Sequence, residues 1–195
     1  MDRERRQREL AEAVWRVIQR EGVENASVRS VASEAGLSTG SLRHYFASQS
    51  ELLQFAMQLV IDRLEARVAG IVVPADPLAA ARTVLAELLP LDAAREAENQ
   101  VWMAFTARAM VDEDLRGVRD DAYDRLRHAS RRWVGRLLPG ATAERQALEA
   151  ERLFALIDGL AVHAAIRPGE TSRDQLVAVL DLHLEQLVSL SEREG

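Results

Sequence analysis

Hydrophobic and polar positions along this chain follow the period of an α-helix almost throughout. The segment from residue 48 to residue 69 shows the pattern most clearly, because its apolar residues recur at intervals of three or four. Those residues are Leu52, Phe55, Ala56, Leu59, Val60, Leu64 and Val68. This spacing places them on one face of a helix. No segment has a convincing two-residue alternation of a strand, so we expect an all-α fold.

Capping and helix-breaking residues divide the pattern into about nine helices. Asp76-Pro77 is typical of a helix start, and Ser172 with Gln175 forms a capping-box signature. Pro-Gly pairs stop two of the later helices. The predicted helices cover residues 2–20, 28–35, 39–46, 48–69, 77–89, 92–110, 112–138, 143–167 and 173–190.

The segment 27–53 carries the most specific signal in the chain. Ser27 is a suitable N-cap for a first short helix, and Gly36 stands where that helix ends, because glycine adopts a positive φ without a Cβ penalty. Ser38 can cap a second short helix over residues 39–46. The early turns of that second helix are polar, so it suits contact with a polar partner. This pattern predicts a helix-turn-helix whose second helix enters the major groove of DNA.

Direct readout of bases requires short donors and acceptors near the start of the recognition helix. Thr39, Ser41 and Arg43 fit that requirement, and Gly40 allows the backbone to approach closely. Arg29, at the start of the preceding helix, can reach a guanine edge or a phosphate. The remaining candidates are His44, Ser27 and Ser48 for phosphates, and Tyr45 for a phosphate, a thymine methyl or, with Phe46, a place in the core.

The same segment, preceded by a helix around Leu10 and Val14, resembles the N-terminal domain of TetR-family transcriptional regulators. The resemblance rests on the run AGLSTGSLRHYF and on the Ser-x-x-Glu-Leu-Leu run that begins at Ser48. It covers about the first quarter of the chain closely and implies DNA contacts at the candidate positions. One departure matters, because the family usually has Lys where this chain has Gln49. The resemblance therefore places Gln49 at the interface but implies that one phosphate charge contact per subunit is missing.

The rest of the chain is similar to the C-terminal domain of BetI-like regulators. The similar stretches are LPLDAAREAENQVWMAFTARA (89–109) and LIDGLAVHAA (156–165). The resemblance implies a DNA-binding domain over residues 1–47 and a helical ligand-binding and dimerisation domain over residues 48–195. Some aromatic and Met residues of the larger domain resemble the walls of a ligand pocket. Such residues at helical spacing are also typical of an ordinary hydrophobic core, so the pocket interpretation and the core interpretation both stay open. The residues that resemble pocket walls are Phe55, Met57, Trp102, Phe105, Thr106, Met110, Tyr123 and Trp133.

Asp158 and His163 interrupt an apolar run from Leu153 to Ile166. A buried, unpaired carboxylate is costly, so Asp158 must find a partner or lie at an edge. One interpretation is that Gly159 lets two helices approach closely, with Asp158 bonding across a subunit interface. The other is a polar anchor in a pocket for a cationic ligand.

Composition and charge narrow the possible functions. The chain has no cysteine, which excludes disulfides and a thiolate metal site, and its four histidines lack metal-ligand spacing. Residues 1–46 hold eight Arg and seven acidic residues, whereas residues 47–195 hold seventeen Arg and twenty-four acidic residues. Residues 1–46 therefore carry a net charge of +1 and residues 47–195 one of −7, so the acidity belongs to the larger domain and the small domain can face phosphates. We found no signal peptide or membrane span in the sequence, so cytoplasmic localisation is expected.

No catalytic motif or cofactor fingerprint is present, so we expect a regulator that is not an enzyme and has no cofactor. The predicted function is a homodimeric repressor that binds an inverted-repeat operator in double-stranded DNA and is released by an unknown small-molecule effector. The alternative is a helical small-molecule- or protein-binding module with little sequence-specific DNA binding. The dimer is predicted to form through the last two helices. Its proposed apolar stripes are Leu153, Leu156 and Leu160, with Leu176, Leu180, Leu184 and Leu187.

Overall fold

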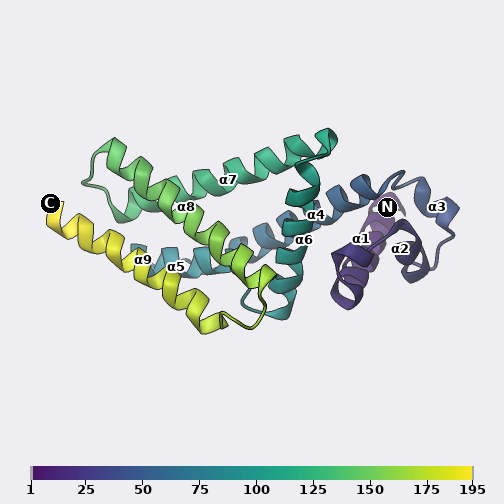
Figure 1. The fold of residues 1–195 in the computed structure, drawn as a ribbon, viewed down its shortest axis with the longest axis horizontal. Coiled ribbons are helices and arrows are strands. Elements are labelled where there is room, and N and C mark those ends of the chain that lie inside the picture. Colours follow the sequence, from purple (N-terminus) through teal and green to yellow (C-terminus); the bar gives the residue numbers. More distant parts are fainter. Residues whose placement is uncertain (1, 195) are drawn as a thin grey trace. The chain divides into compact units, whose positions relative to one another are not determined.

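The computed structural model describes residues 2–194, with side chains for residues 5–191. Within that range the regular structure is entirely helical, with nine α-helices and two short 3₁₀ helices (Figure 1). The predicted all-α fold is thereby confirmed. The elements are α1 (Asp2–Glu21), η1 (Val23–Asn25), α2 (Val28–Glu34), α3 (Thr39–Arg43), α4 (Gln49–Ala69), α5 (Pro77–Leu85), η2 (Ala86–Leu88), α6 (Ala93–Ala109), α7 (Glu113–Leu137), α8 (Ala143–Ile166) and α9 (Arg173–Glu194).

Side-chain caps define several helix starts where the sequence predicted them. The Asp76 carboxylate accepts a hydrogen bond from Ala79 N at 2.7 Å, and Pro77 occupies the first turn of α5. At α9, Ser172 N donates to Gln175 Oε1 at 2.8 Å, and Gln175 N donates to Ser172 Oγ at 3.2 Å. This reciprocal pair satisfies amide groups that the helix itself leaves unbonded.

The helix α3 is shorter than predicted, because it ends at Arg43 and not at Phe46. Tyr45 N and Phe46 N both donate to the Leu42 carbonyl, at 2.8 and 3.0 Å, so the chain tightens into a turn after Arg43. This turn delivers the Phe46 ring, only 5 % exposed, to the hydrophobic core. Burial of that ring therefore takes precedence over a further helical turn.

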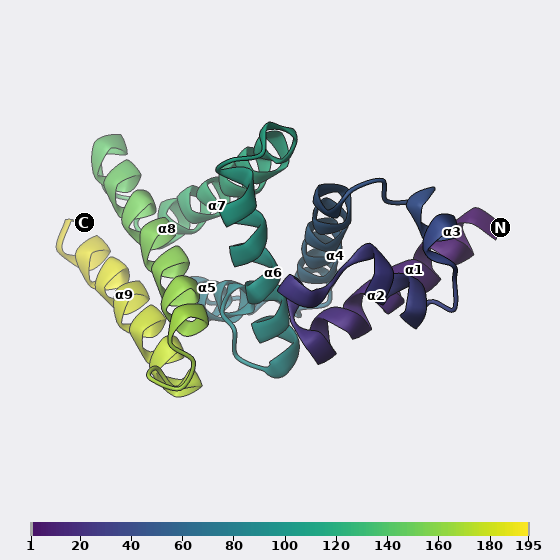
Figure 2. The ribbon, with the colours of Figure 1, turned by 45° about the vertical axis from the view of Figure 1, so that its right-hand side comes forward.

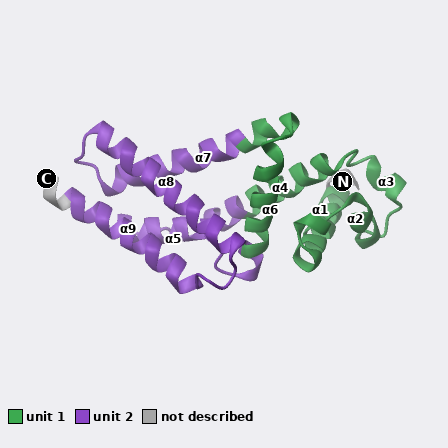
Figure 3. Ribbon diagram, viewed as in Figure 1, with its two compact units in different colours: residues 1–63, 96–119 green, residues 64–95, 120–195 purple. Residues whose placement is uncertain are grey.

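The described chain forms two compact units, each with its own core (Figure 3). Unit 1 comprises residues 1–63 and 96–119, and so contains α1 to α3, most of α4 and most of α6. Its core joins fully buried side chains of α1, α2, α3, α4, α6 and the start of α7, and Figure 2 shows α1, α2 and α3 gathered against one another. Representative members are Val14, Val31, Leu42, Leu52 and Phe105.

Unit 2 comprises residues 64–95 and 120–195, and its core is built from α5, α7, α8 and α9. The helices α8 and α9 run side by side in both views (Figures 1 and 2), joined by a short connection. The unit boundaries differ from the division predicted at residues 47 and 48. That division concerns which residues bind DNA and which bind ligand, and it remains a prediction.

None of the helices described is both long enough and apolar enough to cross a membrane.

Candidate nucleic-acid interface

The turn between α2 and α3 depends on Gly36, whose φ of 65° lies in the left-handed region. Gly36 N donates to the Ser33 carbonyl at 3.3 Å, and Leu37 N donates to the Ala32 carbonyl at 2.9 Å. These two bonds form a Schellman motif, which closes the end of α2. Ser38 Oγ then accepts from Ser41 N at 3.0 Å and starts α3. The predicted helix-turn-helix is therefore present, and local hydrogen bonds hold the turn between α2 and α3.

The helix α3 divides sharply into a buried side and an exposed side. Leu42 is fully buried, and Phe46 follows it into the core. The polar residues of the helix and the turn after it are exposed. Tyr45 is 45 % exposed, so it lies outside the core and the alternative of a Tyr45–Phe46 core pair is wrong for Tyr45. The exposed candidates for DNA contact are Thr39, Gly40, Ser41, Arg43, His44 and Tyr45.

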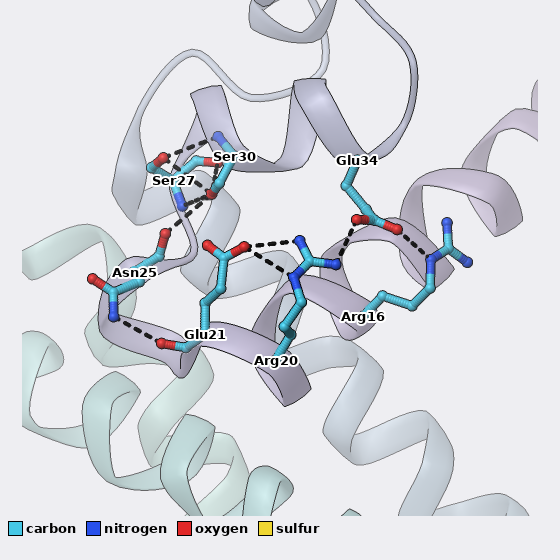
Figure 4. Close-up of polar contacts among 7 residues, drawn as sticks. All are labelled: Arg16, Arg20, Glu21, Asn25, Ser27, Ser30 and Glu34. Carbon is cyan, nitrogen blue, oxygen red and sulfur yellow. Dashed lines mark hydrogen bonds and ion pairs between the residues drawn. The ribbon is translucent and has the colours of Figure 1, made fainter.

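A capping box holds the start of α2. Ser30 N donates to Ser27 Oγ at 3.1 Å, and Ser27 N donates to Ser30 Oγ at 2.8 Å (Figure 4). Ser30 Oγ also lies 3.0 Å from the Asn25 carbonyl. Arg29 projects from this first turn as an exposed side chain. The cap thus fixes the backbone that carries Arg29, one of the candidates for base or phosphate contact.

An ionic network between α1 and α2 was not predicted. Glu34 Oε1 accepts from Arg16 Nε at 2.6 Å, and Glu34 Oε2 accepts from Arg20 Nη1 at 2.8 Å (Figure 4). Arg20 Nη2 also donates to Glu21 Oε1 at 2.8 Å. The hydrogen bonds from Arg16 and then Arg20 hold the pKa of Glu34 below its usual value. The hydrogen bonds that Arg20 donates to Glu34 and Glu21 raise the pKa of Arg20. The i, i+4 spacing of Arg16 and Arg20 was visible in the sequence, but their shared partner was not.

The start of α4 is tied back to the α2 region by Gln49. Glu51 N donates to Ser48 Oγ at 3.1 Å, while the Glu51 carboxylate accepts from Ala47 N at 2.8 Å. Gln49 Nε2 donates to the Ala26 carbonyl at 2.6 Å, next to the N-cap of α2. The side-chain amide at the position where the family usually has Lys is thus engaged within the protein. A phosphate contact by Ser48 or Gln49 remains a prediction.

A second long-range bond joins α4 to the start of α7. Ser50 Oγ donates to Asp112 Oδ2 at 2.6 Å, and Arg108 Nε lies 3.3 Å from the same oxygen. Asp112 Oδ1 also accepts from Asp114 N at 3.2 Å. The Ser50 hydrogen bond is the main reason why the pKa of Asp112 is lowered. This connection was also absent from our sequence predictions.

The residues predicted to line a ligand pocket are distributed over both units. In unit 1, Met57 and Phe105 are buried in the core, and the Phe55 ring packs on Phe46 with centroids 5.0 Å apart. Trp102 packs partly buried against this core, and Thr106 has a buried Oγ1 with no hydrogen-bond partner within the described residues. Met110 is 69 % exposed.

In unit 2 the predicted pocket residues lie in different surroundings. Tyr123 meets Phe154 edge to face, with ring centroids 5.8 Å apart. Trp133 is buried and carries the Arg136 guanidinium 4.9 Å above its ring. Asp158 is half-buried, and His163 is exposed. The ligand role of every residue in both sets stays a prediction.

The predicted dimer stripes are wrong in detail. Leu153, Leu160 and the four α9 leucines belong to the buried core of unit 2, with Leu156 packed against it. Both helices carry apolar residues on a second face, and that face is the exposed one. We call it the α8–α9 surface, and it consists of Leu148, Ala155, Gly159, Val162 and Ile166 of α8 with Val179 and Leu182 of α9.

One polar side chain of α8 and one of α9 are buried. Glu149 and His183 are 4 % exposed each, and Arg145 pairs with Glu149 at 2.8 Å. Arg152, 3.5 Å from Glu149, donates to Gln186 Oε1 at 2.9 Å and so joins α8 to α9. Neither ring nitrogen of His183 has a hydrogen-bond partner within the described residues. Burial is the main cause that lowers the pKa of His183.

The fold and this interface define a helix-turn-helix DNA-binding regulator, with a polar helix exposed on one unit and a second helical unit that completes the chain. Family models identify it further: residues 10–55 match bacterial regulatory proteins of the tetR family, and residues 77–189 match the C-terminal domain of BetI-type transcriptional repressors. The chain belongs to the TetR family of transcriptional regulators.

Individual relatives agree with this assignment. The HTH-type transcriptional regulator PksA of Bacillus subtilis is 39 % identical over 100 % of this chain and 95 % of its own length. A transcriptional regulator from Rhodococcus sp. is similar in structure, with a TM-score of 0.80, 32 % identity and coverage of 94 % of this chain and 96 % of its own. A regulator from Saccharomonospora viridis in complex with choline has a TM-score of 0.78 at 26 % identity, covering 93 % and 96 %.

Proposed function

We propose that this regulator is a homodimeric repressor that binds an inverted-repeat operator and is released by a small-molecule effector. The observation that carries the proposal is the exposed polar face of α3, fixed by the Gly36 turn and by the buried Leu42. A two-fold dimer would place two such helices in successive major grooves, roughly 34–36 Å apart or a multiple of it. We expect the protein to act in the cytoplasm, with its DNA.

The α8–α9 surface supports the homodimer. Its large apolar side chains are exposed in the single chain, where Leu148 and Ile166 are 63 % and 65 % exposed. Gly159 lies near the middle, and a Cβ built there would meet no atom within 4 Å. Packing within the chain therefore gives no reason for a glycine at this position. Close approach of a second copy of α8 supplies one.

The effector we propose is a small organic cation. Support comes from the choline bound by the Saccharomonospora viridis regulator and from the acidity of residues 47–195. Within unit 2, Asp158 follows Phe154 by one turn of α8, so the two side chains project from the same face of the helix, and the Phe154 ring meets Tyr123. A carboxylate with aromatic rings is the chemistry that receives quaternary ammonium groups. Arg127, 4.8 Å above the Phe154 ring, illustrates that this ring accepts a cation.

The primary test is selection of duplexes from a random pool by the purified full-length protein, followed by sequencing. Enrichment of an inverted repeat is the expected result, and the repeat then becomes the probe for effector release. No enrichment at low salt would reject operator binding. It would favour the alternative, a helical small-molecule- or protein-binding module.

The effector class has its own test. Choline is expected to raise the melting temperature and to release the operator, whereas 3,3-dimethyl-1-butanol, its uncharged carbon analogue, should do neither. Asp158→Asn should weaken the response to choline. Equal responses to both compounds would reject a cationic effector.

A further inference from the structure

The four arginines at positions 16, 20, 29 and 43 of unit 1 fall into two groups. Arg29 and Arg43, both predicted to contact DNA, are exposed and form no ion pair with a carboxylate in the described part of the chain. Arg16 and Arg20 of α1 share the carboxylate of Glu34, at 2.6 and 2.8 Å. Arg29 and Arg43 are therefore available to bind an external anion, whereas Arg16 and Arg20 are already bound to a carboxylate of the protein.

Arg20 borders the same surface as the predicted DNA contacts. It lines a surface depression of about 370 Å³ together with Ser27 and Arg29 of the predicted interface, and with Ser30 and Ser33. The other two lining residues, Glu21 and Glu34, are the carboxylates that bind Arg20. An unpaired Arg20 at this edge would be a strong phosphate contact.

The carboxylates around the two α1 arginines outnumber them. Glu34 and Glu21 bind Arg20, and Glu12 lies 3.7 Å from Arg16 in addition to Glu34. Glu34 is the central member, because it alone bridges both arginines and its side chain is only 18 % exposed. A phosphate approaching this edge would meet a cluster with three negative and two positive side chains.

We propose that Glu34 is a specificity-determining residue, which withholds Arg16 and Arg20 from the DNA backbone and so limits non-specific binding. Non-specific affinity comes from phosphates neutralised by basic side chains, whereas the exposed α3 carries the contacts that read sequence. The Glu34 bridge therefore lowers the non-specific affinity for DNA without removing the sequence-reading contacts of α3. This inference rests on the proposed DNA interface at Ser27 and Arg29.

The test measures the salt dependence of binding to a duplex of unrelated sequence. Glu34→Gln, in the full-length protein, is expected to raise this affinity. Each additional phosphate that the protein neutralises adds about 0.9 to the magnitude of the slope of log affinity against log salt concentration. A slope of that size corresponds to a roughly eightfold higher affinity at 0.1 M salt than at 1 M salt. A dimer that neutralises one more phosphate per subunit would then show a slope steeper by about 1.8. Operator affinity should rise less, so the ratio of operator to unrelated-duplex affinity should fall.

Four further variants make the result specific. Glu12→Gln makes the same charge change on α1 but leaves the Glu34 bridge in place, so its slope should stay near that of the parent protein. Adding Arg20→Gln to Glu34→Gln should reverse much of the steeper slope, whereas Arg20→Gln alone should change little. Glu34→Asp keeps the charge but cannot span both arginines, and it preserves the test if the Gln variant folds poorly.

Two results would overturn the inference. Equal slopes for Glu12→Gln and Glu34→Gln would mean that only net charge matters. A lower melting temperature with weaker binding to both duplexes, at unchanged slope, would mean that Glu34 merely ties α1 to α2. Failure to enrich any sequence would reject the operator but not this inference, because the slope is measured on unrelated DNA.

Discussion

Ser50 and Asp112 are 62 residues apart in the chain, yet Ser50 Oγ donates to Asp112 Oδ2 at 2.6 Å. Ser50 belongs to the first turn of α4, directly after Ser48 and Gln49 of the predicted phosphate contacts. Asp112 immediately precedes α7. The bond therefore ties the helix that follows the recognition helix to the corner between α6 and α7, within unit 1.

Ser50→Ala is expected to lower the melting temperature by about 2–4 °C, the shift that loss of one hydrogen bond produces in a chain of this size. The variant should also be less sensitive to acid. The pKa of Asp112 is lowered mainly by Ser50, so its contribution to stability is present above the unfolded value near 3.9 and is lost as pH falls through the folded value. Thermal unfolding between pH 2 and pH 7 checks both effects, and identical pH profiles would contradict them.

Arg43→Ala and Tyr45→Ala should each weaken operator binding by about 1–3 kcal/mol without dissociating the dimer. Both side chains are exposed on α3 or the turn after it, so neither truncation removes core packing. Titration of the selected operator measures the effect. Arg131→Ala, an exposed arginine of α7, is the matched control and should bind normally. Unchanged affinity in both α3 variants would reject the recognition-helix assignment.

Leu182→Arg should dissociate the dimer, because it places a charge on the α8–α9 surface, where Leu182 is 57 % exposed in the single chain. Val72→Arg is the control, since Val72 is 92 % exposed but lies in the connector between α4 and α5. Sedimentation velocity at micromolar concentration separates the two species. If Leu182→Arg remains a dimer, the α8–α9 surface is not the dimer interface.

Tyr123→Ala should reduce the effector response and leave operator affinity in the absence of effector intact. Tyr123 belongs to unit 2, where its ring meets Phe154 edge to face, and it supplies the kind of ring that favours cations. The measurement is the effector concentration that releases half of the operator complex. Should the variant respond normally, Tyr123 would have no part in the effector site.

His183→Leu should flatten the pH dependence of stability below pH 7. Burial, and next the nearby Arg152, lower the pKa of His183, while Glu149 raises it. The unfolded chain therefore takes up this proton first as pH falls, so stability is lost from about pH 6.5 downwards to the folded pKa. The loss is at most about 1.4 kcal/mol per pH unit for a single proton. Urea unfolding of the parent protein and of His183→Leu at pH 5 and pH 7.5 tests this prediction. If the free energy of unfolding differs between the two pH values by the same amount in both proteins, His183 is not the source of the pH dependence.

The sequence by itself determined the helices and the helix-turn-helix. Caps such as Asp76 and Ser172 act through hydrogen bonds to residues three positions away, and the Gly36 turn closes through bonds within six residues. Such local rules can be read from a single chain. These local rules did not predict that α3 ends at Arg43, because that end depends on the burial of the Phe46 ring in the core.

Only the tertiary structure decided the partners of Gln49, Glu34 and Ser50, since each partner lies on a different element. It also decided which face of α8 and α9 is exposed. Both helices carry apolar residues on two faces, so periodicity indicated helices but could not choose the core side. Packing against α5 and α7 made that choice, because burying the leucine-rich face removes the larger apolar area from water.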